Sequence, residues 1–140
     1  MLKYRTFISH AWAYNETYWA IRRMLDAARD GYADFDYVDY SIPDHNPVLD
    51  TKGTLLTGPR LLAAAIQTRI KQSSVLLVPA RMFTAQSDWV TKEIDYAVSI
   101  GTRVIAVRSR ATQRAPIELI QKAHSTVDAN YRSLYNAIKA

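Results

Sequence analysis

Short apolar runs alternate with longer amphipathic stretches along this chain. The apolar runs have the length of buried strands, whereas the amphipathic stretches repeat their apolar residues every three or four positions, as helices do. This alternation is typical of βα units that stack into a parallel sheet. The predicted strands span residues 4–9, 35–40, 74–78, 103–107 and 125–127, and the predicted helices span residues 15–29, 61–72, 88–100 and 131–139, with a further short helix opened by Pro116.

Local signals sharpen this pattern. The run Ser74-Val75-Leu76-Leu77-Val78 is rich in β-branched residues and leucine, so we expect it to be buried at the centre of the sheet. Asn15 and Ser87 are of the residue types that cap helix N-termini. Gly31 and Gly101 follow the ends of two predicted helices, where glycine readily ends a helix.

A long connection, residues 41–60, follows the second predicted strand. It contains three prolines and two glycines, and loops of this length inside a compact domain are usually functional. A plain spacer, or a short helix near residues 48–52, stays open as an alternative. In an open parallel sheet, ligands bind beyond the carboxyl ends of the strands. We therefore expect residues 9–15, 41–60 and 79–93 to form the ligand site.

Composition fits a single globular domain covering residues 1–140. The chain has 140 residues, of which 49% are hydrophobic and 22% charged, and it has no cysteine. Disulfides, zinc knuckles, iron–sulfur sites and thiol nucleophiles are therefore excluded. The first residues lack the apolar core of a signal peptide, and no window reaches the roughly 18 apolar residues that a membrane span needs. We therefore expect a cytoplasmic protein without a membrane partner.

The net charge of +5 is unevenly distributed. Residues 1–50 carry five basic and eight acidic side chains, a net charge of −3, and the rest of the chain carries +8. The basic residues are scattered singly, whereas nucleic-acid binding needs a concentrated basic surface. We expect no nucleic-acid partner.

Several familiar catalytic motifs are absent. The four glycines cannot form GxGxxG, GxxxxGK[ST] or GxSxG. His10 has no histidine four residues away and no nearby glutamate or cysteine ligands, so no metal site is expected. His10 is interpreted either as a loop or helix-cap residue or, because it follows the first strand, as part of a site.

Glu93 is the outstanding candidate for chemistry. It is one of three glutamates and lies four residues after Trp89, so both side chains share one face of the predicted helix. An indole beside a carboxylate lowers the local polarity, raises the pKa of the acid and offers a flat surface to a heteroaromatic ring. The alternative is that Trp89 belongs to the core and Glu93 pairs on the surface with Lys92 or an arginine.

The lack of a second acid on this helix face limits the class of reaction that Glu93 can catalyse. Ordinary glycosidases need a second carboxyl group to protonate the leaving oxygen, and neither Asp88 nor Asp95 shares the face of Glu93. One carboxylate suffices when the leaving group departs neutral, as nicotinamide does when its bond to ribose breaks.

The order and spacing of several segments resemble the TIR-like proteins of the bacterial Thoeris antiphage defence system, the ThsB family. The resemblance covers nearly the whole chain. It is carried by Phe7-Ile8-Ser9-His10-Ala11-Trp12 with Tyr14, Phe35-Asp36, Asp39-Tyr40-Ser41-Ile42-Pro43 with Asn46-Pro47, Ile70-Lys71-Gln72-Ser73-Ser74-Val75-Leu76-Leu77-Val78, Ser87-Asp88-Trp89-Val90-Thr91-Lys92-Glu93-Ile94 and the strand after Gly101.

This resemblance implies a TIR fold, which is a flavodoxin-like α/β fold with a five-stranded parallel sheet and helices on both faces. It also implies that Glu93 is the catalytic glutamate, that residues 41–60 form the BB loop, and that NAD is a substrate while no cofactor is needed. Members of the family are expected to sense a phage-derived trigger, to form homo-oligomers on activation and to make a cyclic ADP-ribose isomer that activates a separate effector. Where relatives have a glycine-containing turn after the third strand, this chain has Ala80-Arg81-Met82-Phe83.

The resulting hypothesis is an NAD glycohydrolase or ADP-ribosyl cyclase. Glu93 is expected to orient the nicotinamide ribose, and Trp89 and Phe83 are expected to flank the ring. The residues expected to line the crevice are Ser9, His10, Trp12 and Asp39. Two alternatives are a non-catalytic TIR module that self-associates or recognises a phage component, and a nucleoside deoxyribosyltransferase.

Overall fold

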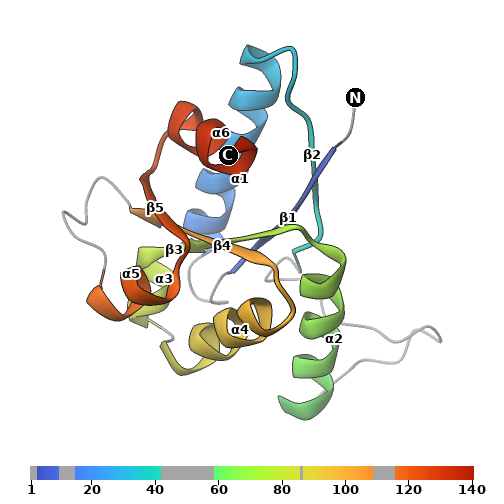
Figure 1. Cartoon of the computed structure of the whole chain (residues 1–140), viewed down its shortest axis with the longest axis vertical. Helices are drawn as coiled ribbons and strands as arrows, with labels where there is room; N and C mark the ends of the chain where they lie inside the picture. The colour runs from blue at the N-terminus through green and yellow to red at the C-terminus, as the bar shows by residue number, and fades with distance from the viewer. Residues whose placement is uncertain (1–2, 10–14, 42–58, 86, 109–115) are drawn as a thin grey trace.

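A computed structural model of the chain describes residues 3–9, 15–41, 59–85, 87–108 and 116–140 (Figure 1). Strands and helices alternate along it. The strands are β1 (Tyr4–Ile8), β2 (Tyr37–Asp39), β3 (Val75–Pro79), β4 (Arg103–Arg108) and β5 (Ser125–Asp128), and the helices are α1 (Asn15–Gly31), α2 (Pro59–Gln72), α3 (Ala80–Ala85), α4 (Ser87–Ser99), α5 (Ile117–Lys122) and α6 (Tyr131–Lys139).

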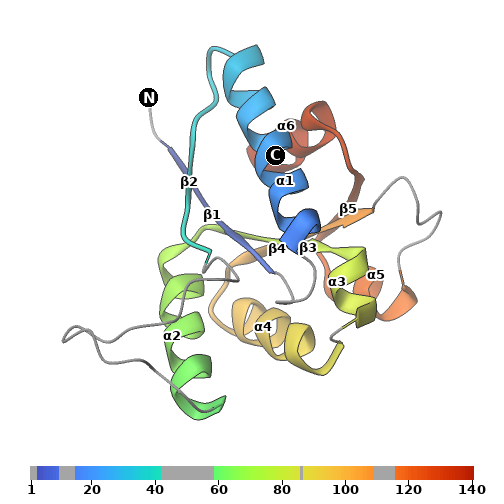
Figure 2. The ribbon, with the colours of Figure 1, turned by 180° about the vertical axis from the view of Figure 1, so that it is seen from behind.

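The five strands form one sheet in the order β2-β1-β3-β4-β5, and every neighbouring pair is parallel. Helices α1 and α6 lie on one face, and α2, α3, α4 and α5 lie on the other (Figures 1 and 2). This is the predicted flavodoxin-like α/β architecture, so the predicted fold class is confirmed. The prediction that residues 74–78 form the central strand is confirmed as well, because β3 pairs with β1 and β4.

The alternation of side chains along the strands creates two hydrophobic cores. Phe7, Leu76 and Val78 point to the face covered by α2, α3 and α4, whereas Ile8 and Leu77 point to the face covered by α1 and α6. All five side chains are almost completely buried. Burial on both faces explains why these strands read as continuous apolar runs.

The predicted helix ends are confirmed, whereas one short helix was not predicted. Residues 80–83 belong to helix α3, whose Met82 and Phe83 are buried in the core. Helix α1 ends at Gly31, as predicted, although Gly31 is not in the left-handed conformation. Gly101, by contrast, lies two residues after the end of α4 and has φ of 80°, where a side chain would be strained. The predicted termination of α4 by glycine is thus confirmed.

Most of the long connection falls outside the described residues. Residues 42–58 are not among the described residues, so the alternative of a short helix near residues 48–52 lies outside them. Helix α2 begins at Pro59, two positions before the predicted start, because proline is well tolerated in the first turn of a helix. Within the described residues, no helix is long and apolar enough to span a membrane.

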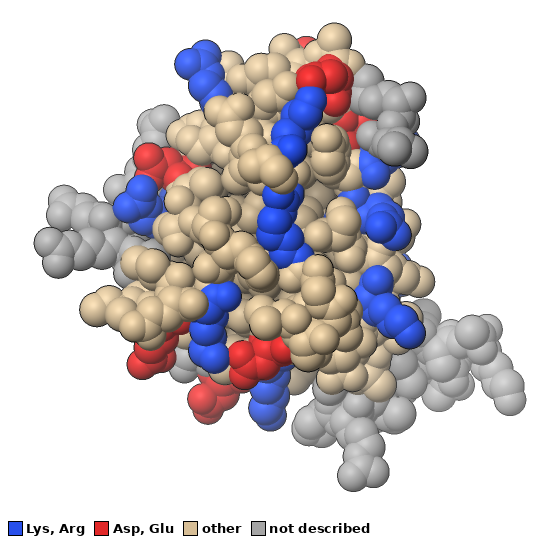
Figure 3. Space-filling model, in the orientation of Figure 1, with Lys and Arg blue, Asp and Glu red and all other residues tan. Residues whose placement is uncertain are grey.

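Charged side chains are spread over the face shown in Figure 3. Lys and Arg side chains stand apart from one another on this face, between stretches of uncharged surface. Several basic residues of the described part of the chain form ion pairs; for example, Lys122 lies 3.0 Å from Asp95 and Arg108 lies 2.8 Å from Asp128. The expected lack of a nucleic-acid partner stays a prediction.

Candidate functional site

Ser9 lies at the carboxyl end of β1 and is completely buried. Its backbone N–H donates to the Leu77 carbonyl over 2.9 Å, which prolongs the pairing of β1 with β3 by one residue. Its hydroxyl donates to Oε1 of Glu93 over 2.6 Å. This bond joins two residues that are 84 positions apart in the sequence.

Helix α4 holds Glu93 against the sheet. Val90, Ile94 and Ala97 recur at helical spacing, and all three are buried in the core on this face. Glu93 lies on the flank of the same apolar stripe and is only 6% exposed. The alternative of a surface ion pair with Lys92 is therefore wrong, because the carboxyl group faces inward and binds Ser9.

Burial changes the acidity of Glu93. Loss of solvent raises the pKa of its carboxyl group from 4.5 to about 8, and the hydrogen bond from Ser9 opposes part of this rise. A carboxyl group with this pKa is mainly neutral at pH 7 and ionises when a positive charge comes close. Strongly shifted carboxyl groups in cavities are typical of functional sites.

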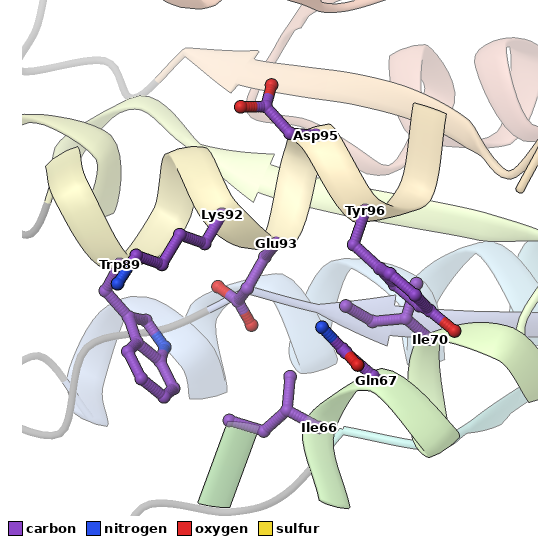
Figure 4. A pocket seen from close by; sticks show the side chains of 8 residues that line it. All are labelled: Ile66, Gln67, Ile70, Trp89, Lys92, Glu93, Asp95 and Tyr96. Atoms are coloured by element: carbon purple, nitrogen blue, oxygen red, sulfur yellow. The ribbon is translucent and has the colours of Figure 1, made fainter. Parts of the chain in front are cut away.

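A cavity of about 290 Å³ lies between α2 and α4 (Figure 4). The Glu93 carboxyl group points into it, whereas the Asp95 side chain points away from it. The lining residues are Ile66, Gln67, Ile70, Trp89, Lys92, Glu93, Asp95 and Tyr96. Apolar walls with a few polar groups are typical of small-molecule sites.

The structure brings three of the predicted site residues together. Glu93 and Trp89 line the same cavity, as their spacing predicted, and Ser9 bonds to Glu93. Phe83 does not line this cavity; it is 3% exposed and packs in the core between α3 and the sheet. Phe83 was expected to flank the ring, but helix α3 turns its side chain into the core instead.

Asp39 lies on the opposite face of the sheet from Glu93. Side chains two residues apart on a strand share a face, so Asp39 joins Tyr37 on the side covered by α1. There it forms an ion pair with Arg22 over 3.0 Å and accepts a hydrogen bond from the Tyr18 hydroxyl. The two other predicted lining residues, His10 and Trp12, lie outside the described residues.

Sequence reasoning missed the contribution of α2. Ile66 and Ile70 are four residues apart and face α4, and Gln67 presents its amide to the cavity near Glu93 (Figure 4). Tyr96 was missed as well, although it lies three residues after Glu93 on α4. Helical spacing places the α2 residues on one side of their helix and Tyr96 near Glu93. Only the packing of α2 against α4 shows that these side chains border one cavity.

The described residues offer no site for a metal ion, since no three His, Asp or Glu side chains among them lie close enough together. The groups that the cavity and its surroundings offer to a ligand include the Glu93 carboxyl group, the Ser9 hydroxyl, the Gln67 amide and the rings of Trp89 and Tyr96. A ligand with a flat aromatic ring suits this cavity, because such a ring packs well against aromatic side chains.

The fold and the buried Ser9–Glu93 pair define the class of this protein as a flavodoxin-like α/β domain with a carboxyl group in a ligand-sized cavity. The model of one family, the TIR-like domain of the Thoeris protein ThsB, matches residues 7–114. The chain belongs to this family, and it is thus a TIR-like protein of the Thoeris defence system.

Solved structures agree on the fold. A conserved protein from Enterococcus faecalis V583 superposes with a TM-score of 0.68 at 15% identity, over 99% of this chain and 98% of that chain. The Clostridium botulinum CMP N-glycosidase BcmB superposes with a TM-score of 0.54 at 11% identity, over 96% of this chain and 98% of that chain. A sequence search among curated proteins finds no match.

Proposed function

We propose that this protein cleaves NAD at the bond between nicotinamide and ribose and forms a cyclic ADP-ribose isomer. The observation that carries the proposal is the buried Ser9–Glu93 pair, which presents one carboxyl group to an aromatic-lined cavity. Membership of the ThsB family supports a role in Thoeris defence. BcmB shares only the fold at 11% identity, so its glycosidase activity is an analogy and carries no weight.

The reaction suits a site with a single carboxyl group. The bond between the ribose C1′ and the ring nitrogen breaks with both electrons moving to nitrogen, so the positive pyridinium leaves as neutral nicotinamide. No acid is needed to protonate the leaving group. The ribosyl carbon becomes positive and oxocarbenium-like, and the carboxylate of Glu93 stabilises it electrostatically.

The positive carbon then takes one of two partners. Water gives ADP-ribose and releases one proton, whereas a nucleophilic atom of the same nucleotide gives a cyclic isomer and also releases one proton. Exclusion of water favours the second outcome. The almost complete burial of Glu93 favours cyclisation for the same reason.

The raised pKa of Glu93 fits a cationic substrate. In the empty site the neutral carboxyl group avoids the cost of a buried charge. The positive nicotinamide ring lowers the pKa again when it binds, because an opposite charge favours the ionised form. NAD binding therefore drives release of the Glu93 proton to the solvent, which leaves the carboxylate that the reaction uses.

The size of the cavity limits what it holds. A volume of about 290 Å³ is at the lower end for small-molecule sites and accommodates a ring with its sugar rather than a whole dinucleotide. Trp89 and Tyr96 supply aromatic surface to the ring. The adenosine half of NAD extends outside this cavity in our proposal.

The proposal includes the wider role expected for the family. The protein responds to a phage-derived trigger, forms homo-oligomers on activation and releases a diffusible product that acts on a separate effector. Membership of the ThsB family supports this wider role, for which the geometry of the cavity offers no argument.

Nicotinamide release from NAD tests the proposal. Concentrated or phage-activated protein is incubated with NAD beside the Glu93→Gln variant, which keeps the shape of the side chain. We expect the variant to lose about 100-fold or more of the rate, as is typical when one electrostatic stabiliser is removed. Glu118→Gln is the matched control, since Glu118 is exposed on α5.

Equal nicotinamide release by the wild type and by Glu93→Gln would overturn the proposal. Full phage protection by Glu93→Ala would instead favour the non-catalytic alternative, in which the domain acts by contact alone. Exchange of deoxynucleosides without NAD turnover would select the deoxyribosyltransferase alternative.

A further inference from the structure

A buried polar cluster lies across the sheet from Glu93. Asp39 is its centre, with a side chain that is 6% exposed. Arg22 donates from Nη1 to Oδ2 of Asp39 over 3.0 Å and from Nε to the Tyr37 hydroxyl over 3.1 Å. The Tyr18 hydroxyl donates to the same Asp39 oxygen. The cluster thus ties the end of β2 to helix α1.

Ser41 connects this cluster to β1. Its backbone N–H donates to Oδ1 of Asp39 over 2.8 Å, and its hydroxyl donates to the same oxygen. The Ser41 hydroxyl in turn accepts the Ile8 N–H over 2.6 Å. One step earlier, the Tyr40 N–H donates to the Thr6 carbonyl over 2.8 Å. A serine side chain therefore continues the pairing of β2 with β1 where backbone pairing ends.

The backbone at the end of β1 is consequently held from both neighbouring strands. On the β2 side the Ser41 hydroxyl accepts the Ile8 N–H, and on the β3 side the Leu77 carbonyl accepts the Ser9 N–H. Ser9 then places its hydroxyl 2.6 Å from Glu93. A shift of about 1 Å at Ser9 takes this bond beyond hydrogen-bond distance.

We propose that Arg22, Asp39 and Ser41 are positioning residues that fix the Ser9–Glu93 pair from the opposite face of the sheet. The inference rests on the proposed function in so far as that pair is catalytic. It assigns Asp39 a part in the site although its side chain lies across the sheet from the cavity.

The titration of Glu93 tests the positioning without any turnover. The chain has only three glutamates, so ¹³C-labelled glutamate gives three carboxyl signals, and Glu93→Gln identifies the one of interest. We expect Ser41→Ala to raise the pKa of Glu93, because the Ser9 hydrogen bond that lowers it is lengthened. Ser9→Ala should give the largest rise, and Ser41→Thr, which keeps the hydroxyl, should restore the wild-type titration.

The other groups around Glu93 are unchanged in these variants. Lys92, Asp95 and Tyr96 line the same cavity and stay in place, so a rise in the pKa of Glu93 reports on Ser9. Ser74→Ala is the matched control. The Ser74 hydroxyl also bonds to the backbone of β1, at the Arg5 carbonyl over 3.1 Å, but at the end of the strand away from the site.

A second variant, Asp39→Asn, covers the case that Ser41→Ala does not fold. Removal of the negative charge of Asp39 by itself lowers the pKa of Glu93, so a rise in this variant has displacement of Ser9 as its cause. In the NAD assay, Ser41→Ala should lose about 10- to 100-fold in kcat with little change in KM, as misplacement by about 1 Å does.

An unchanged Glu93 titration in both Ser41→Ala and Asp39→Asn, together with a clear rise in Ser9→Ala, would overturn the inference. Failure of the proposed function is distinguishable from this result. In that case no variant and no wild-type protein cleaves NAD, while the titration still shows whether Ser41 positions Ser9.

Discussion

At the scale of single residues, the molecule concentrates its unusual chemistry in one carboxyl group. Glu93 is buried on an otherwise apolar helix face, and its carboxyl group accepts a hydrogen bond from the Ser9 hydroxyl. A buried carboxyl group with so little polar support is costly to ionise. Because ionisation is costly only in the folded state, this cost should be visible in the stability of the protein.

The stability of the wild type should fall relative to Glu93→Gln as the pH rises. The folded pKa of about 8 lies above the ordinary value of 4.5, so the unfolded chain releases this proton first. Between these two pKa values, ionisation therefore lowers the free energy of the unfolded state relative to the folded state, by roughly 1.4 kcal/mol per pH unit. Above pH 8 both states are ionised and the difference becomes constant.

Urea unfolding of both proteins between about pH 4 and about pH 9, which brackets the pKa values of 4.5 and about 8, measures this effect. Glutamine does not titrate, so the difference between the two proteins isolates Glu93. A difference that stays flat across the window would show that Glu93 is not buried as described. Glu118→Gln should follow the wild type at every pH.

At the scale of elements, the site depends on how α4 and α2 meet the sheet. Periodicity predicted both helices and the central position of β3, because long amphipathic stretches and buried strands leave clear patterns. Helix α3 was missed because six residues are too few for a helical period. The cavity between α2 and α4 could not be predicted, since no local signal tells which helices become neighbours.

Asp39 illustrates a partial failure of the same kind. Its place at the carboxyl end of a strand was predictable, as was that of Ser9, because parallel strands end at the same edge. The side of the sheet on which the Asp39 side chain lies was not predicted. Asp39 shares a face with Tyr37, two residues earlier, so this side is known once Tyr37 is seen to pack on the face covered by α1. Glu93 and Trp89 were predicted together because one helix turn separates them.

Removal of the Leu77 side chain tests the central role of β3. Leu77 is completely buried between β1 and β4 on the face covered by α1 and α6. Leu77→Ala should destabilise the fold by about 2–5 kcal/mol, as large-to-small substitutions in cores do. Ile117→Ala is the control, because Ile117 is 71% exposed and its loss should change stability by less than about 0.5 kcal/mol. Similar effects of both variants on the urea midpoint would contradict this packing.

At the scale of the whole molecule, the chain forms two cores on either side of one sheet. The face opposite the cavity depends on helix α6, whose Leu134 and Ile138 are buried there. Further contacts tie this helix down, since Arg103 donates to the carbonyls of Ile138 and Ala140. The family match ends at residue 114, yet the sheet and its cover extend well beyond it.

Truncation after residue 130 should therefore abolish cooperative unfolding rather than leave a smaller stable domain. The loss exposes the apolar side of α1 and of the central strands, whose burial contributes about 25 cal/mol per Å². Circular dichroism during heating measures the result. A truncated protein that melts cooperatively at the wild-type temperature would show that α6 is dispensable.

A crystal structure of the Glu93→Gln variant with NAD tests most directly whether the cavity between α2 and α4 is where NAD is cleaved. The variant keeps the shape of the site and should bind the dinucleotide without breaking it. We expect the nicotinamide ring in the cavity beside Trp89, with its ribose within hydrogen-bond distance of residue 93. An intact dinucleotide bound elsewhere on the molecule, with its ribose remote from residue 93, would contradict the proposed function.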